Sequence, residues 1–116
     1  MNQTAERSTV KPLEREIERY FVTQVKKAGG WAIKFQSEGN AGVPDRIVFW
    51  PDGRIHFVEI KRPGENLRPL QISQCKKISG YQQWVYVVDS KEAANLYVLK
   101  QLTPRFMGGR DWEGEA

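Results

Sequence analysis

Apolar residues recur every three or four positions near the start of the chain, which gives one apolar face at helical spacing. These positions are Leu13, Ile17, Phe21, Val25 and Ala28. Pro12 suits the first turn of a helix, and the pair Gly29-Gly30 suits its end. The pattern therefore predicts an amphipathic helix between Pro12 and the glycine pair, with one face packed on a core.

Three short apolar segments follow, and each has the residue pattern of a β-strand. They cover residues 31–35, 45–50 and 55–61. The sequence PDGR between the last two is a strong turn signal, because Pro presets one turn position and Gly tolerates positive φ. We therefore expect these two strands to be antiparallel neighbours.

The second half of the chain returns to a helix pattern at residues 70–80, opened by Pro69. A nearly continuous apolar strand at 84–88 and a last helix at 91–102, capped by Asp89-Ser90, complete the pattern. The order αβββαβα predicts an α/β fold with one mixed sheet flanked by helices. The strand-associated Trp31, Trp50 and Trp84 are expected in its core.

The size and composition fit one soluble domain, since the 116 residues are 40% hydrophobic and 28% charged. We expect a single domain over residues 1–116, with a core at about 12–102 and flexible ends at 1–10 and 103–116. Cys75 is the only cysteine, which excludes an internal disulfide. No apolar run approaches the ~18–20 residues of a membrane span, and the N-terminus has no signal-peptide core. We therefore expect a cytoplasmic protein that is not bound to a membrane.

The predicted hairpin carries ionisable side chains near its open end. Asp45 lies seven residues before Asp52 in the turn and Glu59 seven after it, so the two should meet across the hairpin. Lys61 shares a strand face with Glu59, whereas His56 should face away from them. Two adjacent carboxylates repel each other, and a divalent cation that prefers oxygen ligands removes the repulsion. Such an ion activates water for phosphodiester hydrolysis, although an ordinary ion pair on a half-exposed sheet is the competing interpretation.

The first helix offers a third carboxylate to this group. Glu14 and Glu18 lie one turn apart, on or beside the edge of the apolar stripe, whereas Glu16 lies outside it. A carboxylate at such an edge needs a partner, and a metal ion is one candidate. Ion pairs with basic residues of the same helix are the alternative.

Taken in this order, the chemistry-bearing segments resemble the PD-(D/E)xK nuclease superfamily, and within it the virus-type replication-repair nuclease branch, VRR-NUC. The segments are the Glu-bearing helix, Gly29-Gly30, GVPDRIV at 42–48, the PDGR turn, FVEIK at 57–61 and RPLQ at 68–71. They span about residues 12–88. The resemblance implies a restriction-endonuclease-like αβββαβ core, here with an additional C-terminal helix.

The resemblance also implies roles at the end of the hairpin. Asp45, Glu59 and the backbone carbonyl of Ile60 would bind Mg²⁺ or Mn²⁺. Lys61 would be the catalytic lysine, which orients the water or neutralises the developing phosphorane charge.

The resemblance implies further site residues on the two helices. Glu18 best matches the helix glutamate of the family, from the Ile-Glu step and its distance to the double glycine, and is a candidate for a water-mediated metal ligand. Glu14 is the alternative. Gln71 would lie at the start of the second helix, near the scissile phosphate.

The implied function is that of a Mg²⁺- or Mn²⁺-dependent DNA endonuclease similar to single-domain viral or prophage members. The family resemblance suggests a homodimer that cuts branched DNA, such as four-way junctions, in a bacterium or a phage-infected cell. A catalytically inactive nucleic-acid-binding module is the alternative, and a small interaction domain is a third possibility. The net charge of +4 is compatible with a polyanionic partner. The expected phosphate contacts are Lys34, Arg46, Arg62, Arg68, Lys76 and Lys77.

Overall fold

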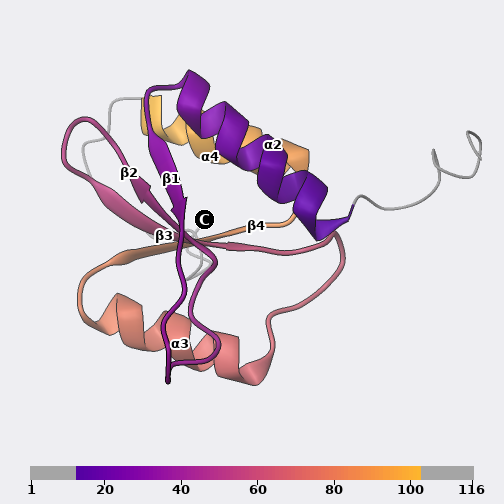
Figure 1. Cartoon of the computed structure of the whole chain (residues 1–116), viewed down its shortest axis with the longest axis vertical. Helices are drawn as coiled ribbons and strands as arrows, with labels where there is room; N and C mark the ends of the chain where they lie inside the picture. Colours follow the sequence, from indigo (N-terminus) through magenta and orange to yellow (C-terminus); the bar gives the residue numbers. More distant parts are fainter. Residues whose placement is uncertain (1–12, 103–116) are drawn as a thin grey trace, which may run out of the picture.

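The computed structural model describes residues 13–102 and contains three helices and four strands in that part of the chain (Figure 1). The helices are α2 (Glu14–Lys27), α3 (Pro69–Gly80) and α4 (Lys91–Leu102). The strands are β1 (Trp31–Lys34), β2 (Arg46–Phe49), β3 (Ile55–Ile60) and β4 (Trp84–Val88). The predicted element order and the α/β class are confirmed. Pro12 and the chain ends that we expected to be flexible lie outside the described residues.

The four strands form one mixed sheet in the order β1-β2-β3-β4. β2 pairs with β1 and β3 in antiparallel fashion, whereas β4 is parallel to β3. A parallel neighbour needs a crossover connection, and α3 supplies it between β3 and β4. The connection from β1 to β2 is a long loop, residues 35–45, which we call the β1–β2 loop.

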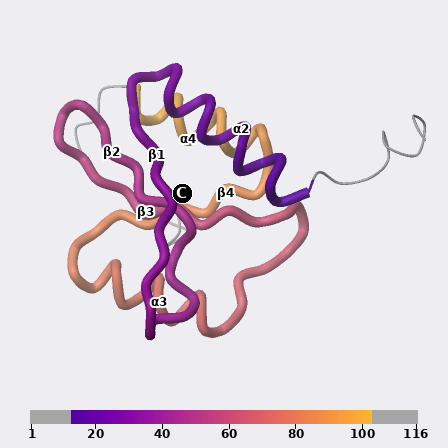
Figure 2. The backbone as a smooth tube through the Cα atoms, viewed as in Figure 1, coloured from indigo at the N-terminus to yellow at the C-terminus, as the bar shows by residue number. Residues whose placement is uncertain are grey.

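Helices cover both faces of the sheet (Figures 1 and 2). α2 and α4 lie together on one face, and α3 lies on the other. The core fills the space between the sheet and the first pair of helices. Its fully buried members include Ile17, Phe21 and Val25 of α2 and Val48, Val58 and Ile60 of the sheet. Each such side chain contributes about 1.5–3 kcal/mol by leaving water, so this face holds most of the hydrophobic stabilisation.

The glycine pair brings the end of α2 close to the sheet. Gly29 has a φ of +96°, which L-residues rarely adopt. A Cβ on Gly30 would lie 2.9 Å from the Trp50 ring and 2.8 Å from Val25 Cγ1. A larger side chain at this position would therefore push the helix away from β2.

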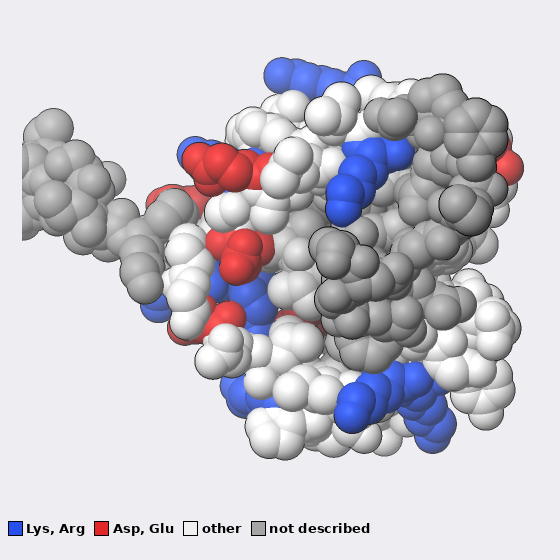
Figure 3. Space-filling view, turned by 180° about the vertical axis from the view of Figure 1, so that it is seen from behind, with Lys and Arg blue, Asp and Glu red and all other residues white. Residues whose placement is uncertain are grey.

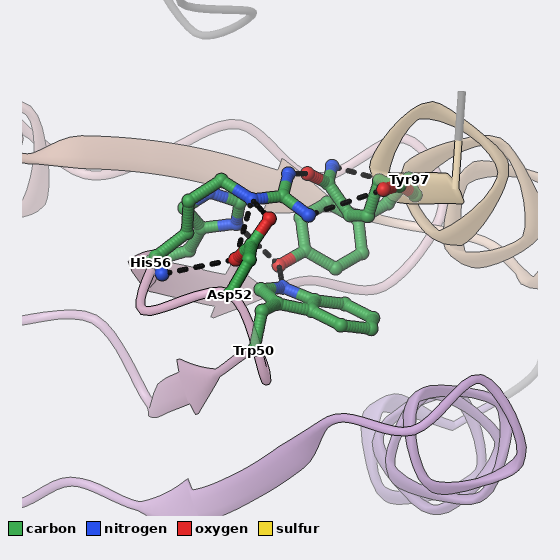
Figure 4. A network of polar contacts seen from close by, with 6 residues as sticks. Trp50, Asp52, His56 and Tyr97 are labelled. Atoms are coloured by element: carbon green, nitrogen blue, oxygen red, sulfur yellow. Dashed lines mark hydrogen bonds and ion pairs between the residues drawn. The ribbon is translucent and has the colours of Figure 1, made fainter. Parts of the chain in front are cut away.

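A buried polar network fills the space under α4 (Figure 4). The Trp50 indole donates to the Tyr97 hydroxyl at 3.0 Å, and His56 Nδ1 lies 2.6 Å from the same oxygen. At the edge of the network Arg54 pairs with Asp52 at 2.8 Å. His56 thus lies on the α4 face of the sheet, as strand alternation predicts, and acts in packing.

The expectation that Trp31 belongs to the core is wrong. Its residue surface is 65% exposed, and its ring lies against Phe49 at a centroid distance of 5.6 Å. The reason is tertiary: β1 is an edge strand, and α3 covers the other half of that sheet face. Trp50 is buried as expected and Trp84 is half-buried.

Among the described helices, none combines the length and apolar character that a membrane crossing requires.

Candidate active site

The pairing of β2 with β3 brings Asp45 and Glu59 together. The last register pair toward the open end of the hairpin is Arg46 with Val58. Asp45 and Glu59 are the next residues outward, so they stand opposite each other. Asp45 Oδ2 accepts a hydrogen bond of 2.9 Å from the backbone N–H of Ile60, which fixes this carboxylate against the end of β3.

Gln71 holds the Glu59 carboxylate from the other side. Its Nε2 donates to Glu59 Oε2 at 2.8 Å, and its Oε1 accepts from the backbone N–H of Arg68 at 2.8 Å. Gln71 lies in the first turn of α3, after Pro69, and is only 7% exposed. The start of α3 therefore positions Glu59, which is itself only 3% exposed.

Lys61 lies beside these carboxylates at the end of β3. Its backbone N–H donates to the Val88 carbonyl at 2.9 Å, which extends the ladder with β4 by one residue. Its side chain is largely buried and shares the strand face of Glu59. The Lys61 charge acts to lower the pKa of Asp45 and of Glu59.

The site holds more negative charge than its own cations neutralise. Burial first, and the nearby Asp45 charge next, raise the pKa of Glu59 to about 8, and Lys61 only partly opposes these effects. Burial also raises the pKa of Asp45, against the stabilising hydrogen bond from Ile60. Two buried carboxylates that repel each other are the chemical setting in which a bound cation is most favourable.

The two helix glutamates have different partners. Glu18 Oε2 accepts from Arg46 Nε at 2.9 Å and lies 3.8 Å from Lys34 Nζ. The pKa of Glu14 is raised by burial first and by the Asp45 charge next, while Lys61 opposes the rise. The Glu18 charge in turn raises the pKa of Asp45. Both glutamates therefore lie near the carboxylate pair, and Glu18 is in addition ion-paired with Arg46.

The residues present fit an ion that takes few protein ligands. Within residues 13–102, no three Asp, Glu, His or Cys side chains are grouped closely enough to hold a metal. Mg²⁺ is commonly held by one or two carboxylates, with waters and substrate phosphate completing its shell. The Ile60 N–H points toward Asp45. In a strand, the carbonyl of a residue points to the same side as its N–H, so the Ile60 carbonyl can serve as a further oxygen ligand for the ion.

The expected phosphate contacts divide into two groups. Arg46 is half-buried and paired with Glu18, and Lys34 lies 3.8 Å from the same carboxylate, so Glu18 partly neutralises both charges. Figure 3 shows acidic side chains gathered where α2 begins, and basic side chains over the α3 side of the same view. The residues in or before α3 that keep exposed cationic groups are Arg68, Lys76 and Lys77, with Arg62 half-exposed.

Sequence reasoning missed two positioning contacts. The ion pair of Glu18 with Arg46 links α2 to the sheet, and alternation could have indicated it because Arg46 shares a face with buried Val48. A second contact is the close approach of Gly42 to α3, where a Cβ would lie 2.9 Å from Leu70 Cγ. No local sequence signal reveals that approach beyond the presence of glycine.

Comparison with known proteins identifies the family. No family model matches the sequence. The chain is 42% identical over 83 residues to the "Putative nuclease p44" of Acyrthosiphon pisum secondary endosymbiont phage 1, a match that covers 72% of this chain and 89% of that protein. A solved structure described as "VRR_NUC domain" superposes with a TM-score of 0.70 and 28% identity over 74% of this chain and 94% of that one. The chain therefore belongs to the VRR-NUC family of nucleases.

Proposed function

We propose that this chain is a metal-dependent DNA endonuclease that uses Mg²⁺ or Mn²⁺. One observation carries the proposal: Asp45 and Glu59 face each other at the end of the hairpin, with Lys61 beside them. Burial raises the pKa of both carboxylates, and the Asp45 charge also raises that of Glu59, so an ion bound between them would stabilise the ionised site. Phosphodiester hydrolysis requires such groups to lie within reach of one phosphate.

Each residue has a separate role in this proposal. Asp45, Glu59 and the Ile60 carbonyl hold the ion, which when bound polarises a phosphate oxygen and lowers the pKa of a water. Lys61 donates hydrogen bonds to the attacking water or to the charged phosphate oxygens. Gln71 keeps the Glu59 carboxylate in one orientation, a positioning role supported by its 2.8 Å hydrogen bond.

Glu14, rather than Glu18, is the proposed helix carboxylate of the site. Asp45 and Lys61 are the leading charged influences on its pKa. A carboxylate in this position would hydrogen-bond to the attacking water and accept its proton. Glu18 instead neutralises Arg46, so we assign it to the attachment of α2 to the sheet.

The DNA substrate and the assembly are proposed from the family resemblance. Branched DNA, such as a four-way junction, is the proposed substrate, and a homodimer is the proposed active form. The exposed basic residues Arg68, Lys76 and Lys77 lie on the α3 side of the site, where they can contact phosphates on one strand. Such contacts between basic side chains and phosphates favour DNA over a neutral partner, but they do not select a base sequence.

The test is cleavage of labelled linear, flap and four-way-junction DNA with and without Mn²⁺. We expect cleavage only with metal, and most rapidly on the junction. Lys61→Ala should reduce the rate about 10²–10³-fold, because it removes a donor to the developing charge, while DNA binding persists. Lys27→Ala, at the exposed end of α2, is the matched control and should cleave normally.

Two results would decide against parts of the proposal. Binding without cleavage of any DNA in Mn²⁺ would favour the inactive binding module. Equal rates for wild type and Lys61→Ala would remove Lys61 from the chemistry. Sedimentation of the free protein tests the homodimer separately.

A further inference from the structure

A hollow of about 280 Å³ lies between the β1–β2 loop, the sheet and α3. Phe35 and Phe57 form its apolar wall, with ring centroids 5.8 Å apart in an edge-to-face arrangement. Asn40 and Gln74 line it with amide groups, and Lys77 and Tyr81 stand on the α3 side. It therefore combines aromatic surface, hydrogen-bonding groups and one cation.

The hollow is held open by contacts that do not depend on a ligand. Gln74 Nε2 donates to the Ala41 carbonyl at 3.1 Å, which ties the β1–β2 loop to the middle of α3. Gly42 then passes so close to Leu70 that a Cβ would lie 3.2 Å from its backbone carbonyl oxygen. Figures 1 and 2 show the β1–β2 loop running down beside α3. The loop and the helix thus form two fixed walls.

The hollow adjoins the carboxylate site. Phe57 lies two residues before Glu59 on the same face of β3, a separation of about 7 Å along a strand. Phe35 is connected to the other carboxylate, because its backbone N–H donates to the Asp45 carbonyl at 2.8 Å. A nucleotide whose phosphate lies between Asp45 and Glu59 therefore has this hollow within reach of its base.

We propose that the hollow holds one unpaired nucleobase of the DNA strand that is cut. This proposal rests on the endonuclease function proposed above. The volume suits a single base ring system. A base must leave the duplex stack before its faces can contact the aromatic side chains. Aromatic side chains stack on any base, which gives binding without sequence preference. A strand with an unpaired nucleotide beside the cleaved bond is then the preferred substrate, which is a physical basis for selecting branched DNA over linear duplex.

The polar groups of the hollow match the edge of a base. Asn40 donates through its Nδ2 to Ser37 Oγ at 3.0 Å, and Gln74 donates through Nε2 to the loop. Each amide thus retains its carbonyl oxygen as an acceptor for an exocyclic amino group. Lys77 is exposed at the rim, where it can contact the phosphate that follows the bound base.

The experiment measures binding to a four-way junction in which single nucleotides near the cleaved bond are replaced, one at a time, by abasic residues. Ca²⁺ replaces Mg²⁺ in these titrations, since it takes the same class of oxygen ligands. For the wild type we expect one position at which loss of the base weakens binding about tenfold, the effect of losing one stacked base. Asn40→Ala and Tyr81→Ala should weaken binding to the intact junction and reduce that difference. Ser73→Ala, exposed on α3 outside the hollow, should retain it.

The outcomes separate this inference from the proposed function. If Mn²⁺ supports cleavage but no abasic position matters, or if both pocket variants keep the full tenfold difference, the base pocket is wrong and the endonuclease proposal stands. If no DNA is cut in Mn²⁺, the endonuclease proposal itself fails. A change in the sedimenting mass of free Tyr81→Ala would assign the hollow to a contact between copies and would overturn the inference.

Discussion

Glu14 and Glu18 lie one turn apart on α2, yet their charges serve different purposes. The Asp45 and Lys61 charges are the leading charged influences on the pKa of Glu14, whereas Glu18 neutralises the half-buried Arg46. Glu14→Gln should lower the cleavage rate about 10–100-fold with little change in stability, as expected for a residue that orients groups around an ion. Glu18→Gln should instead lower the free energy of unfolding by about 1–3 kcal/mol, because the Arg46 charge loses its partner.

Side-by-side rate assays and urea denaturation distinguish the two glutamates. Both activities are compared at a temperature where circular dichroism shows each variant folded. Full activity in Glu14→Gln together with a large loss in Glu18→Gln would reverse our assignment. Full activity in both would exclude the helix from the site.

The Glu59 carboxyl makes the metal-free protein sensitive to pH. Its pKa rises from the ordinary 4.5 to about 8 in the folded chain, so the folded state binds this proton more tightly than the unfolded state does. The stabilisation is complete below about pH 4.5 and is lost as the pH rises through about 8. Between pH 5 and 8 in EDTA, this term should lower the free energy of unfolding by an amount on the order of a few kcal/mol.

Urea denaturation at several pH values checks this sensitivity, with Glu59→Gln as the control. The variant should show a flatter dependence, because its amide cannot titrate. Mn²⁺ should restore stability to the wild type at pH 8, where the ion binds the deprotonated carboxylate. An equally steep pH dependence in both proteins would show that another group is responsible.

At the scale of elements, the β1–β2 loop is positioned by α3. Gly42 has a φ of +89° and no room for a Cβ against Leu70, whereas Gly39 has a φ of +79° with open space around it. Gly39→Ala should cost about 1 kcal/mol, from backbone conformation alone. Gly42→Ala should cost about 1–3 kcal/mol more, from overpacking, and should also slow cleavage because the loop leads into Asp45.

Chemical denaturation and rate assays on the two glycine variants test the role of this contact. The difference in stability and rate between the two variants measures the effect of the close approach of Gly42 to Leu70, because both variants carry the same backbone strain. Equal stability and equal activity in Gly39→Ala and Gly42→Ala would show that the loop does not depend on α3.

The elements also show how far sequence reasoning extends. Helix periodicity, the PDGR turn and strand alternation are local signals, so they predicted the element order and the meeting of Asp45 with Glu59. The exposure of Trp31 depends on which part of the sheet α3 covers, and that is a property of the whole fold. The hydrogen bond from Gln71 to Glu59 likewise depends on where α3 begins in space. The sequence therefore indicated that Gln71 lies near the site, but not that it binds Glu59.

At the scale of the whole molecule, four element ends converge on one side. The start of α2 brings Glu14, the start of β2 follows Asp45, the end of β3 carries Glu59, and the start of α3 carries Gln71. Figure 3 shows acidic and basic side chains next to one another on the side of the molecule where α2 begins. Buried, mutually repelling carboxylates lower stability unless a cation joins them, which is the physical basis of our proposal that an ion binds at this point.

Calorimetric titration of the metal-free protein with Mn²⁺ at pH 8 tests this central claim most directly. The wild type should bind the ion with release of protons, because the raised pKa leaves Glu59 partly protonated at that pH. Asp45→Asn should lose at least 10-fold in affinity, whereas Asp52→Asn, in the distant hairpin turn, should bind as the wild type does. An unchanged isotherm for Asp45→Asn would contradict the account, because the ion would then bind somewhere other than between Asp45 and Glu59.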